Sequence, residues 1–238
     1  MQKPLHLYKY RDLSTEQGRA FTKEIIVDKR VYFALPSSFN DPFEWRYTIS
    51  TQPRNEQEKL MERPLANWGE YGANYVFPHM RKAFGVLSLS AKNDDILMWA
   101  HYANCHKGIC IEFDASDSDS FFGRAKPVVY QSTYPELSIY SPSLRDDIEN
   151  ATLIKSNHWD YEEEYRVVDR QPITVTTSYP GHLLSGIILG CEISEENEKL
   201  IRSWLQQIDE TVTIYRAYLY DNMYCLRIEP EADKRKSA

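Results

Sequence analysis

The chain has 238 residues, 26% of them charged, with a formal net charge of −7, an ordinary composition for a globular protein with a sizeable core. The acidic balance argues against a general nucleic-acid-binding scaffold, which normally carries a basic surplus. Tyrosines number 17 and glycines only 9, and no G-x-G triplet occurs. The chain therefore lacks the glycine-rich loops that bind dinucleotides and phosphates in many enzymes.

Membrane segments and disulfides are not expected. No apolar run approaches the roughly 18 residues of a membrane span, and residues 1–10 have no signal-peptide core. Four cysteines in a chain of this length do not make a disulfide framework. We therefore expect a cytoplasmic protein without a membrane partner.

The first half of the chain mixes short strand patterns with helix patterns. Strands are expected where β-branched and aromatic residues recur, at 5–10, 30–35 and 83–90. Helices are expected at 15–27 with Ser14 as N-cap, within 55–82, and at 96–104 after Asp94 or Asp95.

Strands dominate the second half. They are expected at 108–113, 127–131, 161–169 and 183–190, with helices at 143–157 and 194–208 and a terminal hairpin of 211–220 and 223–229. Because the strands do not alternate regularly with helices, we predict one α+β domain over 1–231 with a mostly antiparallel sheet flanked by helices. Residues 232–238 read as a disordered basic tail.

The most unusual local sequence is WDYEEEYR at 159–166. In a strand, Glu162, Glu164 and Arg166 would share one face. Two carboxylates about 6–7 Å apart beside a guanidinium could act in acid/base chemistry or bind sugar hydroxyls, with their pKa values pushed apart. The alternative is an edge strand whose charges face water. Three successive glutamates oppose strand propensity, which favours a functional reason.

A second motif surrounds the helix expected at 96–104. His101, Cys105, His106 and Cys110 look like soft metal ligands, but Cys110 lies in an apolar strand, where a thiol behaves as a small hydrophobe. We therefore predict no metal site. His101 and Tyr102 belong to a polar and aromatic cluster at the exit of a strand, which either contributes to a site or packs a short helix.

The sequence FNDPFE at 39–44 predicts a turn in which Asp41 bonds to nearby backbone N–H groups. Coordination of Mg²⁺ by Asp41 and Glu44 is the alternative. No acidic pair at nuclease spacing accompanies them, so the structural turn is favoured.

The N-terminal sequence HLYKYR at 6–11 would place His6, Tyr8 and Tyr10 on one face of a strand, with Arg11 directly after them. These side chains could line a cleft. The alternative is that the tyrosines are half-buried rim residues, the commoner position of this residue type.

Four of these strings occur together and in order: LYKYR, VYFALPSSFNDPFE, LSLS followed by MWAHYANCHKGICIEF, and K-x3-W-x2-E-x-E-x-R from Lys155 to Arg166. With this combination the chain resembles an uncharacterised bacterial family, domain of unknown function 2971, over about residues 7–189. The resemblance supplies motifs and implies no mechanism.

The order of the polar motifs is also similar to that of the ADP-ribosyltransferases. These enzymes place an early Arg or His, a middle Ser or Tyr and a late Glu-x-Glu on a compact split sheet, and bind NAD in a cleft without a glycine-rich loop. Here the early residues are His6 and Arg11, and the late motif is Glu162-x-Glu164. The similarity implies a split sheet and NAD as substrate.

The same similarity implies roles for individual residues. Glu164 would bond to the ribose 2′-hydroxyl and stabilise an oxocarbenium-like centre as nicotinamide leaves, and Glu162 would position or deprotonate the acceptor. Tyr102 or Tyr8 would stack on nicotinamide, and Arg11 or His6 would bind ribose or phosphate. The expected NAD-binding set is Tyr8, Arg11, Ser88, His101, Tyr102 and Arg166.

Three functions are left open. The favoured one is an NAD-consuming transferase or hydrolase, a toxin or phage-defence effector with an unknown macromolecular acceptor, in which Glu162, Glu164, Tyr102 and an early His or Arg converge on one cleft. A metal-dependent nuclease or phosphoesterase would use the carboxylates of Asp41, Glu44, Glu162 and Glu164. A non-enzymatic interaction or sensing module would show a satisfied ion network without a cavity beside it. Homo-oligomerisation also stays open.

Overall fold

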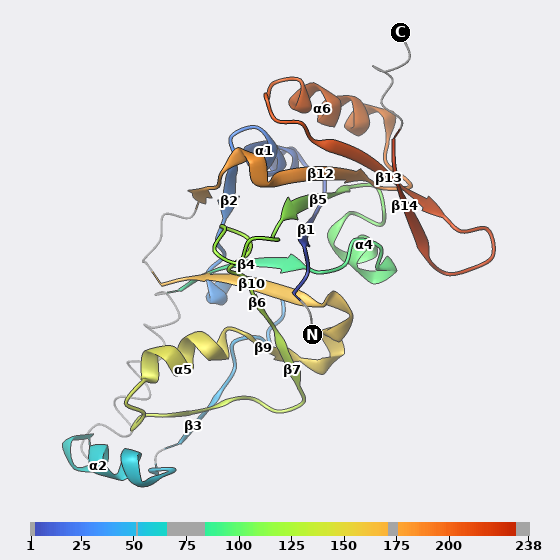
Figure 1. Cartoon of the computed structure of the whole chain (residues 1–238). Coiled ribbons are helices and arrows are strands. Elements are labelled where there is room, and N and C mark those ends of the chain that lie inside the picture. Colours follow the sequence, from blue (N-terminus) through green and yellow to red (C-terminus); the bar gives the residue numbers. More distant parts are fainter. Residues whose placement is uncertain (1–2, 51, 66–83, 171–175, 232–238) are drawn as a thin grey trace.

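The computed structural model describes residues 3–50, 52–65, 84–170 and 176–231. Its centre is an eight-stranded sheet in which all neighbouring strands are antiparallel except one parallel pair (Figure 1). The order is β14 (Leu226–Pro230), β13 (Thr213–Leu219), β12 (Leu184–Leu189), β5 (Ile109–Asp114), β1 (His6–Arg11), β4 (Gly85–Ser90), β10 (Glu164–Asp169) and β6 (Lys126–Pro127). The predicted α+β fold with a mostly antiparallel sheet is confirmed.

Short strand pairs and helices surround this sheet. The pairs are β2 (Arg30–Tyr32) with β11 (Thr176–Ser178), β3 (Thr48–Ser50) with β8 (Glu136–Ser138), and β7 (Val129–Gln131) with β9 (Ile154–Ser156). The helices of the described residues are α1 (Glu16–Ile26), α2 (Glu56–Leu65), α4 (Ile96–Tyr102), α5 (Leu144–Ala151) and α6 (Glu195–Leu205). Three short 3-10 turns lie at Pro36–Ser38, Asn157–Glu162 and Gly181–Leu183.

Side-chain caps explain where three helices begin. Asp95 accepts hydrogen bonds from the N–H groups of Leu97 and Met98 and starts α4, and Ser194 caps α6. The cap of α1 is Thr15, which accepts from the Gly18 N–H. The expected cap Ser14 is wrong, because its hydroxyl donates to Asp12 instead.

Two expected elements differ in extent near the later site. The helix expected at 143–157 ends at Ala151, and residues 154–156 turn into β9, which pairs in parallel with β7. The strand expected at 161–169 begins only at Glu164, because Glu163 has a left-handed φ of 40° and closes a 3-10 turn. The β-branched Thr152 and Ile154 fit the change from helix to strand.

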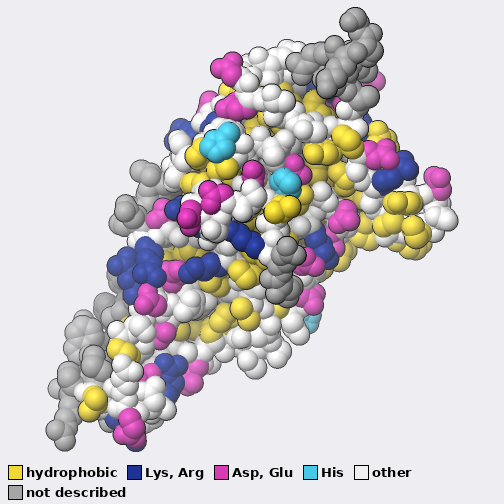
Figure 2. Space-filling model, in the orientation of Figure 1, with side chains coloured by type: hydrophobic (Ala, Val, Ile, Leu, Met, Phe, Trp, Pro, Cys, Tyr) yellow, Lys and Arg dark blue, Asp and Glu magenta, His cyan; other side chains and the backbone are white. Residues whose placement is uncertain are grey.

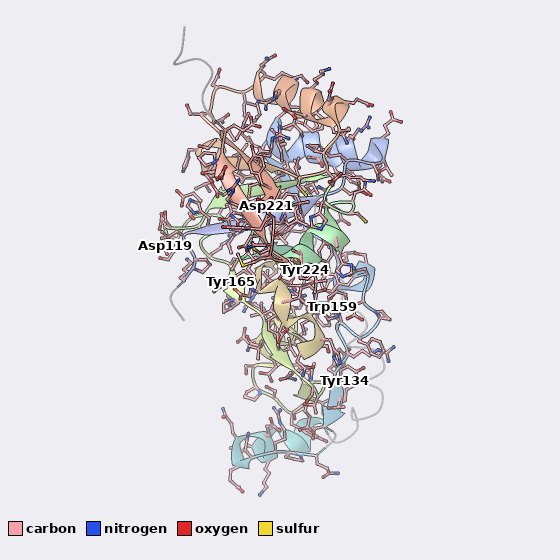
Figure 3. All side chains as sticks on the ribbon, turned by 90° about the vertical axis from the view of Figure 1, so that its right-hand side faces the viewer. Asp119, Tyr134, Trp159, Tyr165, Asp221 and Tyr224 are labelled. Atoms are coloured by element: carbon pink, nitrogen blue, oxygen red, sulfur yellow. The ribbon has the colours of Figure 1, made fainter. Side chains whose placement is uncertain are left out.

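Smaller differences concern other elements. The strand expected at 127–131 is divided into β6 and β7, and the one expected at 30–35 is reduced to β2 with an isolated bridge from Ala34 to Val86. The terminal hairpin is present as β13 and β14, with a loop that carries Asp221 and the fully exposed Tyr224 (Figure 3). In the region 55–82 the structure describes α2, while 66–82 and the tail 232–238 lie outside the described residues.

Each face of the central sheet has its own core. On one face Leu7, Leu87 and Ile111 pack with apolar residues of α1 and α6, such as Ile26 and Trp204. On the other face Tyr8, Tyr10 and Cys110 pack with Met98 and Trp99 of α4. Strand β1 supplies both faces because its side chains alternate.

The sheet is almost divided in two between β1 and β4. These strands are aligned at a single residue pair, Tyr8 with Ser90, whereas β1 pairs with β5 along its whole length. Lys9 of β1 spans this seam and donates a hydrogen bond from Nζ to the carbonyl oxygen of Ser88 at 3.0 Å. We call the line between β1 and β4 the seam.

Acidic and basic side chains are interspersed over the visible face of the molecule (Figure 2). Among the described residues, no helix combines the length and the apolar character needed to cross a bilayer.

Candidate functional site

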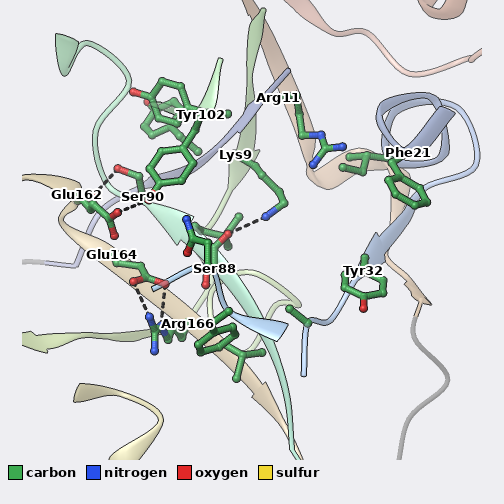
Figure 4. A pocket seen from close by; sticks show the side chains of 18 of the residues that line it. Lys9, Arg11, Phe21, Tyr32, Ser88, Ser90, Tyr102, Glu162, Glu164 and Arg166 are labelled. Carbon is green, nitrogen blue, oxygen red and sulfur yellow. Dashed lines mark hydrogen bonds and ion pairs between the residues drawn. The ribbon is translucent and has the colours of Figure 1, made fainter. Parts of the chain in front are cut away.

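A cleft of about 630 Å³ opens at the seam (Figure 4). Its walls come from β1, β4, α1, α4, β2 and the segment that enters β10. Residues from distant stretches of sequence meet here, and seven of the predicted site residues line the cleft: Tyr8, Arg11, Ser88, Tyr102, Glu162, Glu164 and Arg166.

One end of the cleft holds a buried ionic cluster of Glu44, Lys155, Glu162, Glu164 and Arg166. Arg166 is its centre: Nε donates to Glu164 Oε1 at 2.7 Å, and Nη2 donates to Glu164 Oε2 at 2.8 Å. Nη2 also bonds to Glu44, and Nη1 donates to the Thr152 carbonyl at 2.6 Å. Bidentate geometry of this kind fixes both side chains and makes the pair strong.

Lys155 joins the carboxylates to one another. Its Nζ bonds to Glu162 and donates to Glu164 Oε2 at 3.2 Å, and it lies 3.9 Å from Glu44 Oε1. The ammonium also lies over the ring of Trp159, 5.1 Å from its centroid, a favourable cation–π arrangement. Lys155 lies on strand β9. It reaches the site because α5 ends at Ala151 and the following residues form this strand.

The cluster is withdrawn from water and carries an excess negative charge. Its five side chains are at most 6% exposed. Three carboxylates face two cations, so the net charge is −1 when all five are ionised. The interpretation of the glutamates as an edge strand facing water is therefore wrong. An unbalanced buried cluster attracts a positive group to the adjacent cleft.

The two central glutamates have different pKa values. Burial alone would raise the pKa of Glu164, but the charge and hydrogen bonds of Arg166, with help from Lys155, lower it to about 2. Burial raises the pKa of Glu162 above its ordinary value, although the Lys155 charge opposes this effect. Glu164 therefore stays ionised at neutral pH, and Glu162 is the carboxylate better suited to exchange a proton.

The segment before β10 sets the position of Glu162. Tyr102, from α4, donates its hydroxyl to Glu162 Oε1 at 2.7 Å. Ser90 holds the backbone, since its Oγ donates to the Glu162 carbonyl at 2.6 Å. The left-handed Glu163 turns its own side chain outward to an exposed ion pair with Lys92. Glu162 and Glu164 thus point to the same side through a local turn rather than through regular strand geometry.

The other end of the cleft is basic. Lys9 and Arg11 both line it, and Arg11 Nε donates to the hydroxyl of Thr22 in α1 at 3.1 Å. Within the described ranges neither cation lies within ion-pair distance of a carboxylate. Burial, together with the nearby Arg11 charge, lowers the pKa of Lys9 to about 8, and burial also lowers the pKa of Arg11.

Two predicted histidines do not reach the cleft. His101 is exposed on α4 and its ring packs beside Trp159 and Tyr161, at centroid distances of 6.4 Å. The inclusion of His101 in the NAD-binding set is therefore not supported by its position. His6 also lies outside the cleft lining, so Arg11 is the early residue that reaches it.

The FNDPFE turn contributes an ion pair to the site, where the sequence indicated a structural turn or a Mg²⁺ ligand. Asp41 makes the predicted turn, accepting from the Phe43 N–H at 2.8 Å, and it also accepts from Trp159 Nε1 at 2.8 Å. Glu44 leaves the turn and enters the ionic cluster. Within the part of the chain that is described, no group of three or more His, Cys, Asp or Glu is arranged to hold a metal.

Three residues of the site are absent from the set predicted for the favoured function: Lys9, Lys155 and Glu44, the last of which was considered only as a metal ligand in the nuclease alternative. Lys155 and Glu44 stood inside the recurring motif strings, which was the available signal. Lys9 is part of LYKYR, but in a strand it faces the opposite side from Tyr8 and Tyr10, which were the residues predicted to line a cleft.

The partners of Glu44 and Lys9 lie 122 and 79 positions away in the chain, so spacing alone could not assign these two residues. Lys155 is close to Glu162 and Glu164 in sequence, but it reaches them only because residues 154–156 form a strand.

Comparison with known families supports the motif-based resemblance. Residues 98–167 match the family described as protein of unknown function (DUF2971). The match confirms that resemblance over these residues, whereas the resemblance was expected over about 7–189. The DUF2971 segment runs from α4 into β10 and contains Tyr102, Lys155, Glu162, Glu164 and Arg166. No curated protein and no solved structure matches the chain.

Proposed function

We propose that the chain binds NAD in the seam cleft and breaks the bond between nicotinamide and ribose, passing ADP-ribose to an acceptor or to water. The observation that supports this best is the polarity of the cleft. Glu162, Glu164 and Tyr102 gather at one end around a net negative cluster, and Lys9 and Arg11 lie along the other part without carboxylate partners among the described residues.

NAD matches this polarity because its own charges are separated in the same way. Its nicotinamide ring is a cation bound to ribose C1′, and its diphosphate is an anion several bonds away. A ligand oriented with nicotinamide near the glutamates and phosphates near Lys9 and Arg11 meets the opposite charge at both ends. The reverse orientation would place like charges together.

The cluster also suits the transition state. The C1′–N bond breaks with its electron pair going to nicotinamide, which leaves neutral while the ribose becomes an oxocarbenium-like cation. The excess charge of the cluster is preorganised to stabilise that cation. Glu164 has about four acceptor positions, of which Arg166 and Lys155 use three, and the Ser88 side chain also bonds to this carboxylate. A ribose hydroxyl would take the place of Ser88.

The second step is attack of the acceptor on C1′. Its nucleophilic atom forms the new bond and releases a proton, for which Glu162 is the base. Its raised pKa, caused by burial, suits proton exchange. Tyr102 holds Glu162 through its hydroxyl and presents its ring to the cleft, where nicotinamide would lie.

The alternatives receive less support. An interaction module was expected to show a satisfied ion network without a cavity, whereas the ionic cluster borders a cleft. A metal-dependent nuclease would use oxygens of Glu44, Glu162 and Glu164 that Lys155 and Arg166 already bind.

The proposed setting is the bacterial cytoplasm, where the chain would act as a toxin or phage-defence effector on a macromolecular acceptor. All four cysteines are free in the structure, which suits a reducing compartment.

The test is incubation of the wild-type protein with NAD labelled in the adenylate part, alone and with cell lysate. We expect transferred label or free nicotinamide, and a loss of at least about 10²-fold in Glu164→Gln. Glu162→Gln should retain NAD binding while losing transfer. The matched control is Glu163→Gln, whose side chain is 52% exposed and paired with Lys92.

Folding of each variant is checked by its melting temperature. A wild-type protein that neither binds nor consumes NAD would overturn the proposal. Equal losses of activity in Glu163→Gln and Glu162→Gln would also count against it, because the effect would then not depend on the cleft.

A further inference from the structure

The basic end of the cleft has a second feature besides its charge. Phe21 of α1 and Tyr32 of β2 line the cleft there and are 46% and 45% exposed. In Figure 4 both rings lie on the side of Arg11, across Lys9 and Ser88 from the ionic cluster. These two aromatic side chains lie beside two cations, and covering either ring with a ligand would be favourable.

The two cations keep most of their hydrogen-bonding capacity. A lysine ammonium has three N–H donors and a guanidinium has five. Lys9 uses one, toward Ser88, and Arg11 uses one, toward Thr22. The remaining donors are available to an acceptor in the cleft. Desolvating a cation without a carboxylate partner costs free energy, and a bound anion would offset this cost.

The other charged residues at this end do not neutralise the pair. Arg30 lines the cleft and donates to the Thr176 hydroxyl at 2.6 Å. Glu24 is the acidic residue of α1 in the lining, and it forms no ion pair with Lys9 or Arg11 in the described structure. The local excess of charge is therefore positive, opposite in sign to the ionic cluster.

We propose that this end of the cleft is a subsite for the phosphorylated aromatic half of a nucleotide, in which Lys9 and Arg11 bind the diphosphate and Phe21 and Tyr32 contact the base. Charge-assisted donors suit phosphate oxygens, and exposed rings bind bases by stacking. The subsite depends on the proposed function in one respect, the position of the nicotinamide half of NAD. Binding of the adenylate half requires no catalysis.

A simple anion is a poorer fit for this end of the cleft. Inorganic pyrophosphate would use the two cations and leave both rings in water. A cleft of about 630 Å³ lies in the range of small-molecule sites, about 300–1,000 Å³. A nucleotide uses both the charged and the aromatic parts of this surface.

The test is calorimetric titration of the full chain with ADP, adenosine and inorganic pyrophosphate. We expect ADP to bind at least about 10-fold more tightly than either fragment, since a charged hydrogen bond and a stacked base each contribute on that scale. Lys9→Met and Arg11→Gln should each weaken ADP about 10-fold and leave adenosine unchanged. Phe21→Ala and Tyr32→Ala should weaken both ADP and adenosine.

Two control variants lie outside the cleft. Lys23→Met removes an exposed cation of α1, and Tyr134→Ala removes a ring that is 44% exposed (Figure 3). Neither should change ADP affinity. Phe21→Ala and Tyr32→Ala alter exposed side chains, so they keep the test valid even where Lys9→Met fails to fold.

The protonation of Lys9 gives an independent readout. Its pKa of about 8 reflects burial and the charge of Arg11 from its own strand, opposed by Glu164 of β10. ADP affinity should therefore fall as pH rises above about 8. This fall should disappear in Lys9→Arg, which stays charged and should still bind ADP.

The outcomes separate the two proposals. If the wild type binds ADP and the four cleft variants bind it more weakly, the subsite is supported even where NAD is never consumed. Absence of ADP binding in the wild type, or ADP affinity equal to that of the wild type in both Phe21→Ala and Lys9→Met, overturns it. Consumption of NAD with an unchanged KM in those variants would overturn the subsite and leave the proposed function standing.

Discussion

Two of the ionic networks in the described part of the chain differ in burial and balance. The buried ionic cluster beside the cleft joins three carboxylates to two cations. A second network, on α6, β13 and the residue after β14, joins Glu198, Arg202, Arg216 and Glu231. Its side chains are 22% to 37% exposed, and its two positive and two negative charges cancel.

The exposed network links elements at the protein surface, whereas the buried ionic cluster gives one end of the cleft a net negative charge. Exposed pairs gain little, since water competes for both partners. Buried pairs depend on each other, because removal of one partner leaves the other charged and desolvated. The balanced network lines no part of the described cleft, whereas all five members of the unbalanced cluster do.

The largest expected effect is the removal of the central guanidinium. Arg166→Met should lower the free energy of unfolding by about 3–5 kcal/mol, because Glu44 and Glu164 lose their main partner inside the protein. Urea denaturation measures the change. A loss below about 1 kcal/mol would show that the cluster is held no more tightly than a surface network.

The second-largest effect is expected at acid pH, where protonation of Glu164 in the buried cluster should lower the stability of the fold. The pKa of Glu164 is about 2 in the folded chain and 4.5 in its ordinary state. The resulting stability, on the order of 3 kcal/mol, is complete above the ordinary pKa and is lost as pH falls toward 2. Melting temperatures between pH 6 and 2.5 should therefore fall more steeply in the wild type than in Glu164→Gln. Parallel curves would contradict this.

The smallest effect is expected in the balanced network. Arg216→Ala breaks the ion pairs to Glu198 and Glu231 and should cost about 0.2–1 kcal/mol, because these side chains are partly in water. Added salt should reduce even this difference. Chemical denaturation at low and high ionic strength measures both quantities. A cost equal to that of Arg166→Met would remove the distinction between the two networks.

Much of the fold and part of the site followed from local sequence. The cap at Asp95 and the strand patterns of β1, β4 and β5 were readable because they depend on neighbouring residues. The shared side of Glu162 and Glu164 was predicted, but through strand alternation. The chain achieves it with a left-handed Glu163, and this backbone conformation was not foreseeable because the position holds neither glycine nor asparagine.

The rest depended on distant contacts. Glu44 meets Arg166 across 122 positions of sequence, and Lys9 meets Ser88 across 79. No periodicity encodes such a contact, and the outcome depends on how β9 and the seam place the side chains. The end of α5 at Ala151 was equally decisive, because Lys155 reaches the carboxylates from a strand.

The seam between β1 and β4 has a consequence for the edges of the sheet. A free strand edge normally faces solvent and invites pairing with another chain. Here two edges face each other inside one molecule, one closing the five strands from β14 to β1 and the other closing the three strands from β4 to β6. Their backbone groups are screened from foreign strands yet border the cleft, as the Ser88 carbonyl does when it accepts from Lys9. A ligand in the cleft would therefore meet main-chain donors and acceptors that no side-chain substitution can remove.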